Sequence, residues 1–233
     1  MLILSVDTSS PSGGAALLQD ETVVSESLRG SAKWQSARIF REVEEILERG
    51  EARMADVELF AVCVGPGSFT GLRVGLTAVK AWAEVWGRPV AAVSGLEAVA
   101  ALATEPAKIR VPMLDARRGQ VYAGLYARLE RQAYLSRVGE EVVLSPEEFF
   151  TWMDGQREES PLIVSPSGEA ILAIVSAAGR RSLRMETVTD ILAGMIGRLG
   201  FRKAKRGEAV DALRLDASYI RRSDAELNWK ESA

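Results

Sequence analysis

The sequence contains no histidine and only one cysteine. Without an imidazole, histidine-ligated metal sites, Ser-His-Asp or Cys-His nucleophiles and histidine acid–base catalysis are all excluded. Cys63 lies within the apolar run LFAVCVG, which is typical of a small buried side chain in a reducing compartment. Any catalysis by this chain would therefore depend on carboxylates, hydroxyls, lysine, arginine or backbone groups.

Long apolar runs and a basic excess are missing as well. No segment approaches the roughly 18 apolar residues of a membrane span, and MLILSVD lacks the basic start of a signal peptide. Lysine and arginine total 29 against 32 for aspartate and glutamate, whereas a domain that binds nucleic acid alone usually carries a basic excess. The composition predicts a cytoplasmic protein without membrane contact, and it disfavours autonomous binding of nucleic acid.

The predicted elements alternate between strands and helices, which indicates an α/β protein. Three short strands within residues 2–28 are followed by a helix from Lys33 to Arg49, whose pairs Arg38/Glu42 and Arg41/Glu45 are expected on the solvent side. An apolar strand over residues 57–65 then leads through GPGSFTG into a long helix that ends near Trp86-Gly87.

A weak internal repeat suggests that one α/β unit occurs twice. Sliding the first segment by 108 residues aligns Val6-Asp7 with Leu114-Asp115 and Ala15 with Ala123, without a gap. The alternative is chance similarity between two amphipathic hairpins. We expect an N-terminal lobe over residues 1–106 and a smaller lobe over residues 107–233, and whether the tail returns to the first lobe stays open.

The loop after the first strand, DTSSPSGG, has the composition of a phosphate-binding loop. Asp7, Thr8 and Ser9 offer a carboxylate and hydroxyls beside small residues with free backbone N–H groups. The same residue types form ordinary turns. The later segment GPGSFTGLRVG favours a bend and a capped helix, although it matches neither common glycine-rich phosphate motif.

The helix after GPGSFTG has more apolar and small surface than one core needs. Roughly 220° of its circumference is apolar or small, whereas a surface helix needs about 100°. Burial between the sheet and the preceding helix is one explanation, and a subunit interface is the other. The candidate interface residues on the two helices are Ile39, Val43, Gly67, Phe69, Gly71, Gly75, Ala78 and Trp82.

Three weaker signals concern charge. Arg117-Arg118 follows Asp115 where a second phosphate loop would lie, but the pattern also fits a solvated turn. The run FRKAKRG at residues 201–207 could touch RNA phosphate, although a surface loop is favoured. Glu97 has no evident partner and is expected to be exposed.

Together, these segments resemble a known family. The sequence GPGSFTGLR, with MLDARRGQVYAGLY and the tail SYIRRSDAELNWKE, resembles the TsaB (YeaZ) family. Asp7-Thr8-Ser9 is similar to the first phosphate loop of the actin-like ATPase (ASKHA, ribonuclease-H-like) fold. The resemblance implies an α/β, duplicated actin-like fold with two mixed-sheet lobes, and a role in forming threonylcarbamoyladenosine in tRNA.

The resemblance also implies a non-catalytic subunit, with no catalytic residue and no metal site of its own. It would form a heterodimer with TsaD, associate with the ATPase TsaE through the complex, and form a homodimer when alone. The complex would transfer threonylcarbamoyl from threonylcarbamoyl-AMP to N6 of the tRNA adenosine 3′ of the anticodon, and tRNA would be reached only through the complex. In this family the two N-terminal helices form the interface.

In the paralogue TsaD, a pair of histidines spaced H-x-x-x-H binds a metal, and their positions fall here on Gly95 and Val99; another TsaD histidine, at the start of the first helix, falls on Gln35. The resemblance thus implies that the ligand positions exist without the ligands. No cofactor would be required, and ATP or ADP would at most make a weak contact at a vestigial loop of Asp7, Thr8 and Ser9. The alternative is an actin-like-fold ATPase or nucleotide-binding protein that acts on its own.

Overall fold

The computed structural model describes residues 1–10, 12–27, 38–128, 134–155, 161–168, 183–218 and 220. The chain forms two compact units, one of Met1–Ala98 with Ile191–Ala233 and one of Val99–Asp190. The sequence predicts a boundary at residue 106 and a second lobe over residues 107–233, and it leaves open whether the tail returns to the first lobe. The structure instead returns the chain to the first unit at Ile191, because helix α6 (Ala193–Lys205) packs on the first sheet.

The first unit is built on a five-stranded mixed sheet in the order β3-β2-β1-β4-β5. Strand β1 pairs antiparallel with β2 and parallel with β4, so it lies at the centre of the sheet. Every residue of β4 is buried, as its unbroken apolar run predicts for a strand covered on both faces. The strands are β1 (Leu2–Asp7), β2 (Gly14–Gln19), β3 (Thr22–Glu26), β4 (Leu59–Gly65) and β5 (Val90–Ser94).

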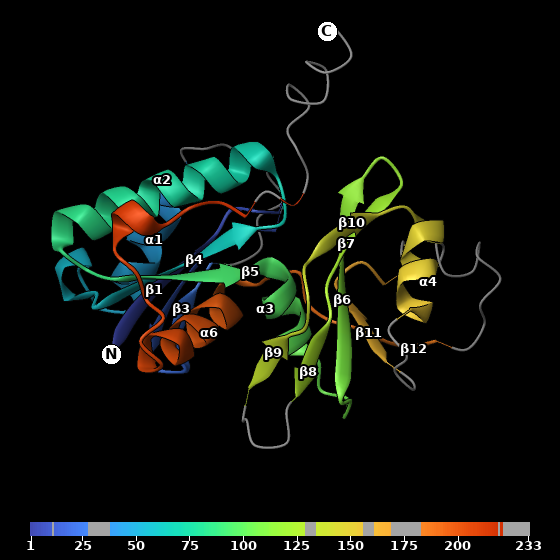
Figure 1. Cartoon of the computed structure of the whole chain (residues 1–233). Coiled ribbons are helices and arrows are strands. Elements are labelled where there is room, and N and C mark those ends of the chain that lie inside the picture. The colour runs from blue at the N-terminus through green and yellow to red at the C-terminus, as the bar shows by residue number, and fades with distance from the viewer. Residues whose placement is uncertain are drawn as a thin grey trace, which may run out of the picture. The chain divides into compact units, whose positions relative to one another are not determined.

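Helices cover both faces of this sheet (Figure 1). Helices α1 (Arg38–Arg49) and α2 (Phe69–Trp86) lie on one face, and α6 lies on the other. The Ser68 side chain caps α2, and Gly87 ends it in the left-handed conformation at φ 59°, which confirms the predicted end. The predicted start of the first helix at Lys33 lies outside the described residues.

The two charged pairs predicted on the solvent side of α1 differ in their surroundings. Arg41 and Glu45 are exposed and lie 3.1 Å apart. Glu42, which pairs with Arg38, is only 8% exposed and also accepts a hydrogen bond from Ser27 Oγ. The expectation was wrong for Glu42, since the chain beyond β3 brings Ser27 over this side of the helix.

The second unit repeats the strand order of the first, as β10-β7-β6-β11-β12, and β8 and β9 extend its sheet beside β6. Helix α3 (Gly95–Leu102) leads into this unit, and α4 (Pro146–Asp154) packs against β7 and β10. The strands are β6 (Ile109–Arg117), β7 (Gln120–Ala123), β8 (Tyr126–Arg128), β9 (Leu135–Arg137), β10 (Val142–Leu144), β11 (Leu162–Ser165) and β12 (Arg184–Thr187).

The shared strand order confirms the repeat but corrects its alignment. Asp7 pairs with Gly14 across a loop of six residues, whereas Asp115 pairs with Val121 across a loop of five. The gap-free alignment therefore slips by one residue after the loop. Two short 3-10 helices, η1 (Met54–Asp56) and η2 (Ala212–Arg214), complete the described elements. Within the described residues, no helix is both long and apolar enough to cross a membrane.

Candidate partner interface and phosphate loop

Asp7 ends β1 and organises the loop that follows it. Its Oδ1 atom accepts hydrogen bonds from Ser9 N at 2.8 Å and from Ser9 Oγ at 2.6 Å. The side chain is fully buried, and Oδ2 has no hydrogen-bond partner among the described residues. Burial raises the pKa of Asp7, and the Ser9 hydrogen bonds and the nearby Cys63 thiol only partly oppose that rise.

The GPGSFTG segment closes over this loop. Ser68 N donates to Ser9 O at 2.7 Å, and a Cβ on Gly67 would lie 2.4 Å from Ser9 O. A Cβ on Gly71 would lie 2.0 Å from Thr8 O, so only glycine allows this approach. Thr8 is 0% exposed and Ser9 is 6% exposed. The structure thus brings Asp7, Thr8 and Ser9 together in a buried loop that supports the start of α2. A phosphate could reach their side chains only if the GPGSFTG segment moved away.

The second unit repeats the turn at Asp115 in an open setting. Asp115 Oδ1 accepts a hydrogen bond from Arg117 N at 2.6 Å, the same two-residue step as at Asp7. Asp115, unlike Asp7, is exposed. Arg117 and Arg118 both have left-handed backbones, with φ of 61° and 54°, which is unusual for residues other than glycine. The hairpin tip thus presents two arginines to solvent beside an exposed carboxylate.

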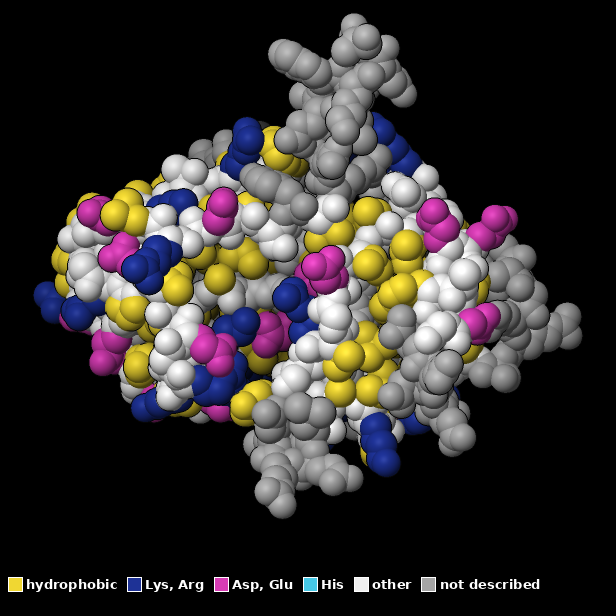
Figure 2. Space-filling view, in the orientation of Figure 1, with side chains coloured by type: hydrophobic (Ala, Val, Ile, Leu, Met, Phe, Trp, Pro, Cys, Tyr) yellow, Lys and Arg dark blue, Asp and Glu magenta, His cyan; other side chains and the backbone are white. Residues whose placement is uncertain are grey.

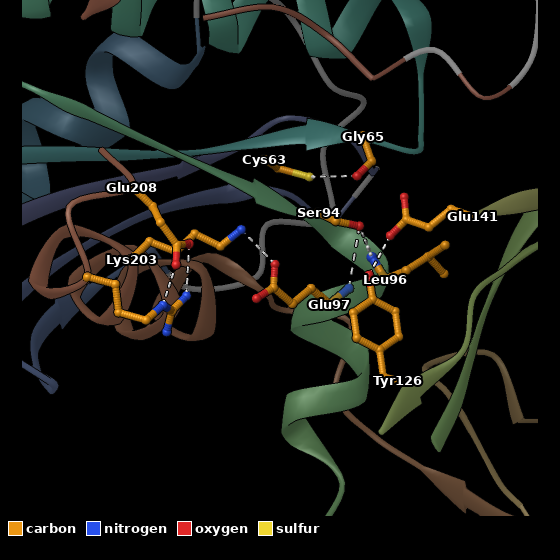
Figure 3. Close-up of polar contacts among 10 residues, drawn as sticks. Cys63, Gly65, Ser94, Leu96, Glu97, Tyr126, Glu141, Lys203 and Glu208 are labelled. Atoms are coloured by element: carbon orange, nitrogen blue, oxygen red, sulfur yellow. Dashed lines mark hydrogen bonds and ion pairs between the residues drawn. The ribbon is translucent and has the colours of Figure 1, made fainter. Parts of the chain in front are cut away.

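The basic run at residues 201–207 is helical as far as Lys205, which corrects the predicted loop. Lys203 Nζ pairs with Glu97 at 2.9 Å, and the two side chains point toward each other in Figure 3. Glu97 is therefore partnered, and its side chain is only 15% exposed. Arg202 pairs with Glu21 at 2.7 Å, and basic and acidic side chains intermingle over the first unit in Figure 2. These ion pairs leave little free positive charge in the run for RNA.

Most of the predicted interface residues lie inside the first unit. Ile39, Val43 and Ala78 are 0%, 1% and 4% exposed, and Gly71 and Gly75 pack against Thr8. These five residues cannot touch a partner while the unit stays folded, so this part of the interface prediction is corrected. The physical reason is that the stripe of small residues on α2 faces the loop after β1. Of the two explanations for the extra apolar surface, burial within the unit therefore fits these residues better than a subunit interface.

The exposed apolar residues of α2 lie on a different side of the helix from the stripe of small residues. Val85 is 74% exposed and Phe40 is 48% exposed, while Trp82 is half-buried. The Phe40 and Trp82 rings meet edge to face at 5.7 Å, which joins α1 to α2. Val74, half-buried, and the exposed Ala81 continue the surface. We call the set of Phe40, Val74, Ala81, Trp82 and Val85 the α1–α2 patch.

Sequence reasoning missed four of these five residues as interface candidates. Val74, Ala81 and Val85 recur at steps of seven and four, the spacing of a helical contact ridge, and that spacing was the available signal. Of the predicted interface residues, Trp82 belongs to the patch. Phe69 is 37% exposed on another side of α2, where the Arg73 guanidinium lies 3.9 Å from its ring centroid. Gly67 is half-buried against Ser9.

Several known proteins similar to this chain are named for the formation of threonylcarbamoyladenosine in tRNA. The model of the family described as "TsaD: tRNA N6-adenosine threonylcarbamoyltransferase" matches residues 30–195. A Bacillus subtilis protein named tRNA threonylcarbamoyladenosine biosynthesis protein TsaB is 32% identical, over 100% of this chain and 99% of its own length. The chain belongs to the TsaB family. An Escherichia coli TsaB is 32% identical over 63% of this chain and 64% of its own length.

The solved structure of YeaZ from Pseudomonas aeruginosa has a similar fold. It superimposes with a TM-score of 0.72 over 94% of this chain and 99% of its own chain, at 24% identity. With the duplicated strand order, this likeness gives the TsaB-family chain an α/β actin-like fold with two sheets. The predicted family and fold class are thereby confirmed.

Gly95 and Val99, the positions expected to align with the two metal-binding TsaD histidines, have no side chain that could bind a metal. Gly95 and Val99 lie four residues apart at the start of α3, and both are buried. Gln35 lies outside the described residues. In the part of the chain that the structure describes, no three Cys, Asp or Glu side chains gather in a group that could hold a metal ion.

Proposed function

We propose that this TsaB-family chain is a non-catalytic subunit that pairs with TsaD. The chain serves tRNA threonylcarbamoyladenosine biosynthesis, the pathway for which its relatives in B. subtilis, Haemophilus influenzae and E. coli are named. In the proposed complex, threonylcarbamoyl passes from threonylcarbamoyl-AMP to N6 of the tRNA adenosine 3′ of the anticodon. The chain would work in the cytoplasm and require no cofactor of its own.

The α1–α2 patch is the observation that supports this proposal. Large apolar side chains exposed together on two adjoining helices are typical of a surface that a partner covers. The Phe40–Trp82 contact fixes one helix to the other, so the patch is a rigid surface rather than a set of scattered side chains. TsaD is the partner we assign to it, with a second copy of this chain in its place when TsaD is absent and with TsaE joining through the complex.

Two features favour an accessory role over catalysis by this chain. The sequence offers no histidine for acid–base or metal chemistry. The buried Asp7 loop holds α2 in position instead of facing an open cleft. An actin-like ATPase acting on its own would need that loop open to a metal-bound phosphate, so ATP or ADP would make at most a weak contact here.

Charging the patch tests the proposal. In Val85→Asp, a carboxylate replaces a 74% exposed valine, so the fold should persist while an apolar contact with the partner is lost. We expect the affinity for cognate TsaD, measured by analytical ultracentrifugation, to fall at least 10-fold, which corresponds to about 1.4 kcal/mol. Threonylcarbamoyladenosine formation by the reconstituted system should fall with it, and it should stop when this chain is omitted.

Val138→Asp is the matched control, because Val138 is a 44% exposed valine of the second unit. It should leave the affinity for TsaD unchanged. Equal affinities for unmodified chain, Val85→Asp and Val138→Asp would rule out the α1–α2 patch as the interface. Turnover of ATP by the isolated chain, lost on Asp7→Asn, would favour the ATPase alternative instead.

A further inference from the structure

Four cationic residues gather at one end of β6 in the second unit. Lys108 lies directly opposite Arg128, whose N–H donates to Lys108 O at 3.0 Å. Arg110 lies opposite Tyr126, and Tyr126 lies opposite Arg137 on the next strand. Opposite residues share one face of a sheet, and so do residues two apart. We call the set of Lys108, Arg110, Arg128 and Arg137 the basic edge.

Arg110 is the fixed member of the basic edge. Its side chain is 5% exposed, and its two terminal nitrogens donate to Ala100 O at 2.8 Å and to Glu105 O at 3.3 Å. These bonds hold the guanidinium against the end of α3, so it cannot turn away from its neighbours. Burial lowers the pKa of Arg110, and the charge of Arg128 lowers it further, although Glu186 nearby opposes the fall.

The other three members carry charge that the described residues do not neutralise. Lys108, Arg128 and Arg137 are exposed, and none forms an ion pair with an aspartate or glutamate of the described ranges. Like charges directly opposite each other on paired strands destabilise a sheet. Some basic residues elsewhere do form ion pairs, such as Arg53 with Asp56 and Arg202 with Glu21. The basic edge therefore concentrates positive charge at a cost to folding, which an external anion would offset.

A polyanion that carries several phosphates is the ligand that a cluster of exposed cations attracts. Exposed lysine and arginine side chains bind phosphate oxygens and position a nucleic acid without reading its sequence. The net charge of −3 explains why such contacts would not hold RNA unaided. We propose that the basic edge binds the phosphate backbone of the tRNA substrate, so that this subunit contacts RNA directly within its complex. The inference rests on the proposed pairing with TsaD, and it departs from the expectation that tRNA is reached only through the partner.

The test replaces two exposed cations together. In Lys108→Gln with Arg128→Gln, two phosphate contacts are lost while side-chain size is nearly kept. We expect the affinity of the chain–TsaD complex for unmodified tRNA, measured by fluorescence anisotropy, to fall about 10-fold. The slope of log affinity against log salt should become shallower by about 1.4 to 1.8, since each phosphate contact contributes roughly 0.7 to 0.9.

Arg53→Gln with Lys205→Gln is the matched control. It also replaces one exposed arginine and one exposed lysine, but both lie in the first unit. Affinity and salt slope should stay at the values of the unmodified complex. The basic-edge variant should melt no lower than the unmodified chain, because the repulsion between Lys108 and Arg128 is removed.

Three results would overturn the inference. The first is an intact variant complex that binds tRNA with unchanged affinity and slope. The second is equal loss in the basic-edge and control variants, which would indicate a general charge effect. The third is loss of TsaD from the variant in analytical ultracentrifugation, which would make the basic edge a protein-binding surface. Failure of the proposed function is separate, because it appears as an unmodified chain that does not pair with TsaD.

Discussion

Asp7 keeps a carboxyl group in a fully buried position, where ionisation loses the solvation that water provides. Ser9 supplies two hydrogen bonds to one oxygen, while the other oxygen has none from the described residues. The raised pKa of Asp7 follows from this imbalance. Asp7 therefore holds the loop through its hydrogen bonds to Ser9 although burial makes its ionised form less stable.

The raised pKa of Asp7 predicts how stability depends on pH. Because the pKa of Asp7 is raised in the folded state, the folded chain holds this proton more tightly than the unfolded chain does. Its favourable contribution is complete below the unfolded pKa and is lost as pH rises through the folded pKa. Asp7→Asn keeps the acceptor for Ser9 and removes the titration. Its free energy of unfolding, relative to that of the unmodified chain, should therefore rise as the pH increases above about 4, the ordinary pKa of an aspartate.

Urea unfolding at a series of pH values measures this difference, and Asp115→Asn is the control. Asp115 accepts the same kind of backbone hydrogen bond in an exposed position, so its variant shows what the substitution does without burial. A difference between Asp7→Asn and the unmodified chain that stays constant with pH would contradict the expectation.

Residue-level predictions from the sequence succeeded where the signal was local. Cys63 is buried, as its apolar neighbours indicated, and Ser68 caps α2. Glu97 was misjudged because its partner Lys203 lies far away in the sequence, and no local pattern reveals such an ion pair. Glu42 was misjudged for the same reason, since Ser27 comes from another element.

Helix α2 packs closely on the loop after β1 because two residues of the helix that face this loop, Gly71 and Gly75, are glycines. A Cβ on Gly75 would lie 2.2 Å from Thr8 Oγ1, well inside any tolerable contact. Alanine is a better helix former than glycine by about 1 kcal/mol, but overpacking a tight contact costs about 1–3 kcal/mol. We expect Gly75→Ala to lower the free energy of unfolding by up to about 2 kcal/mol, the difference between these two effects, as measured by urea denaturation.

Thr77→Ala provides the control on the same helix. Thr77 is exposed, so its replacement should change stability by no more than about 0.5 kcal/mol. If Gly75→Ala were as stable as Thr77→Ala, the contact between α2 and Thr8 would not require glycine at position 75.

The existence and end of α2 could be predicted from the sequence, but its buried side could not. Helical periodicity gives the angle of each residue around the axis and leaves the neighbour unspecified. The stripe of Gly71, Gly75 and Ala78 therefore fitted a partner helix and an internal loop equally well. Only the fold, which brings Thr8 beneath α2, distinguishes the two.

At the scale of the whole molecule, each unit has buried hydrophobic clusters of its own among the described residues. The core of the second unit gathers around Phe149, which is 0% exposed and packs with Val111, Val121 and Ile163. In the first unit, one cluster lies between the sheet and helices α1 and α2, and buried side chains such as Leu18 and Ile196 fill the face that α6 covers. Each core can therefore lose stability without the other.

Phe149→Ala tests this independence. Removing a buried phenylalanine should lower the stability of the second unit by about 3–5 kcal/mol. Hydrogen exchange followed by mass spectrometry should show faster exchange in β7 and β10, with β1 and β4 unchanged. Equal acceleration in all four strands would instead indicate a single cooperative unit.

The duplicated architecture could be predicted from the sequence because each copy begins with an apolar strand that runs to an Asp, although β6 continues past Asp115 to Arg117. The division of the chain could not, because α6 comes after the second unit in sequence but packs on the first sheet. Composition and periodicity identify α6 as an amphipathic helix without indicating which sheet it covers. Its fit to Leu18 and Ala61, through Gly197 and Gly200, is a long-range contact.

This interleaved course has a consequence for the order in which the nascent protein can be completed on the ribosome. All residues of the second unit are translated before α6, so that unit can close first. The sheet of the first unit keeps one face uncovered until Lys205 has emerged. The bend at Gly65 waits longer still, for Ser218 N to bond Val64 O. The half of the chain that is synthesised first is thus the last to be finished, and it is the half that carries the α1–α2 patch.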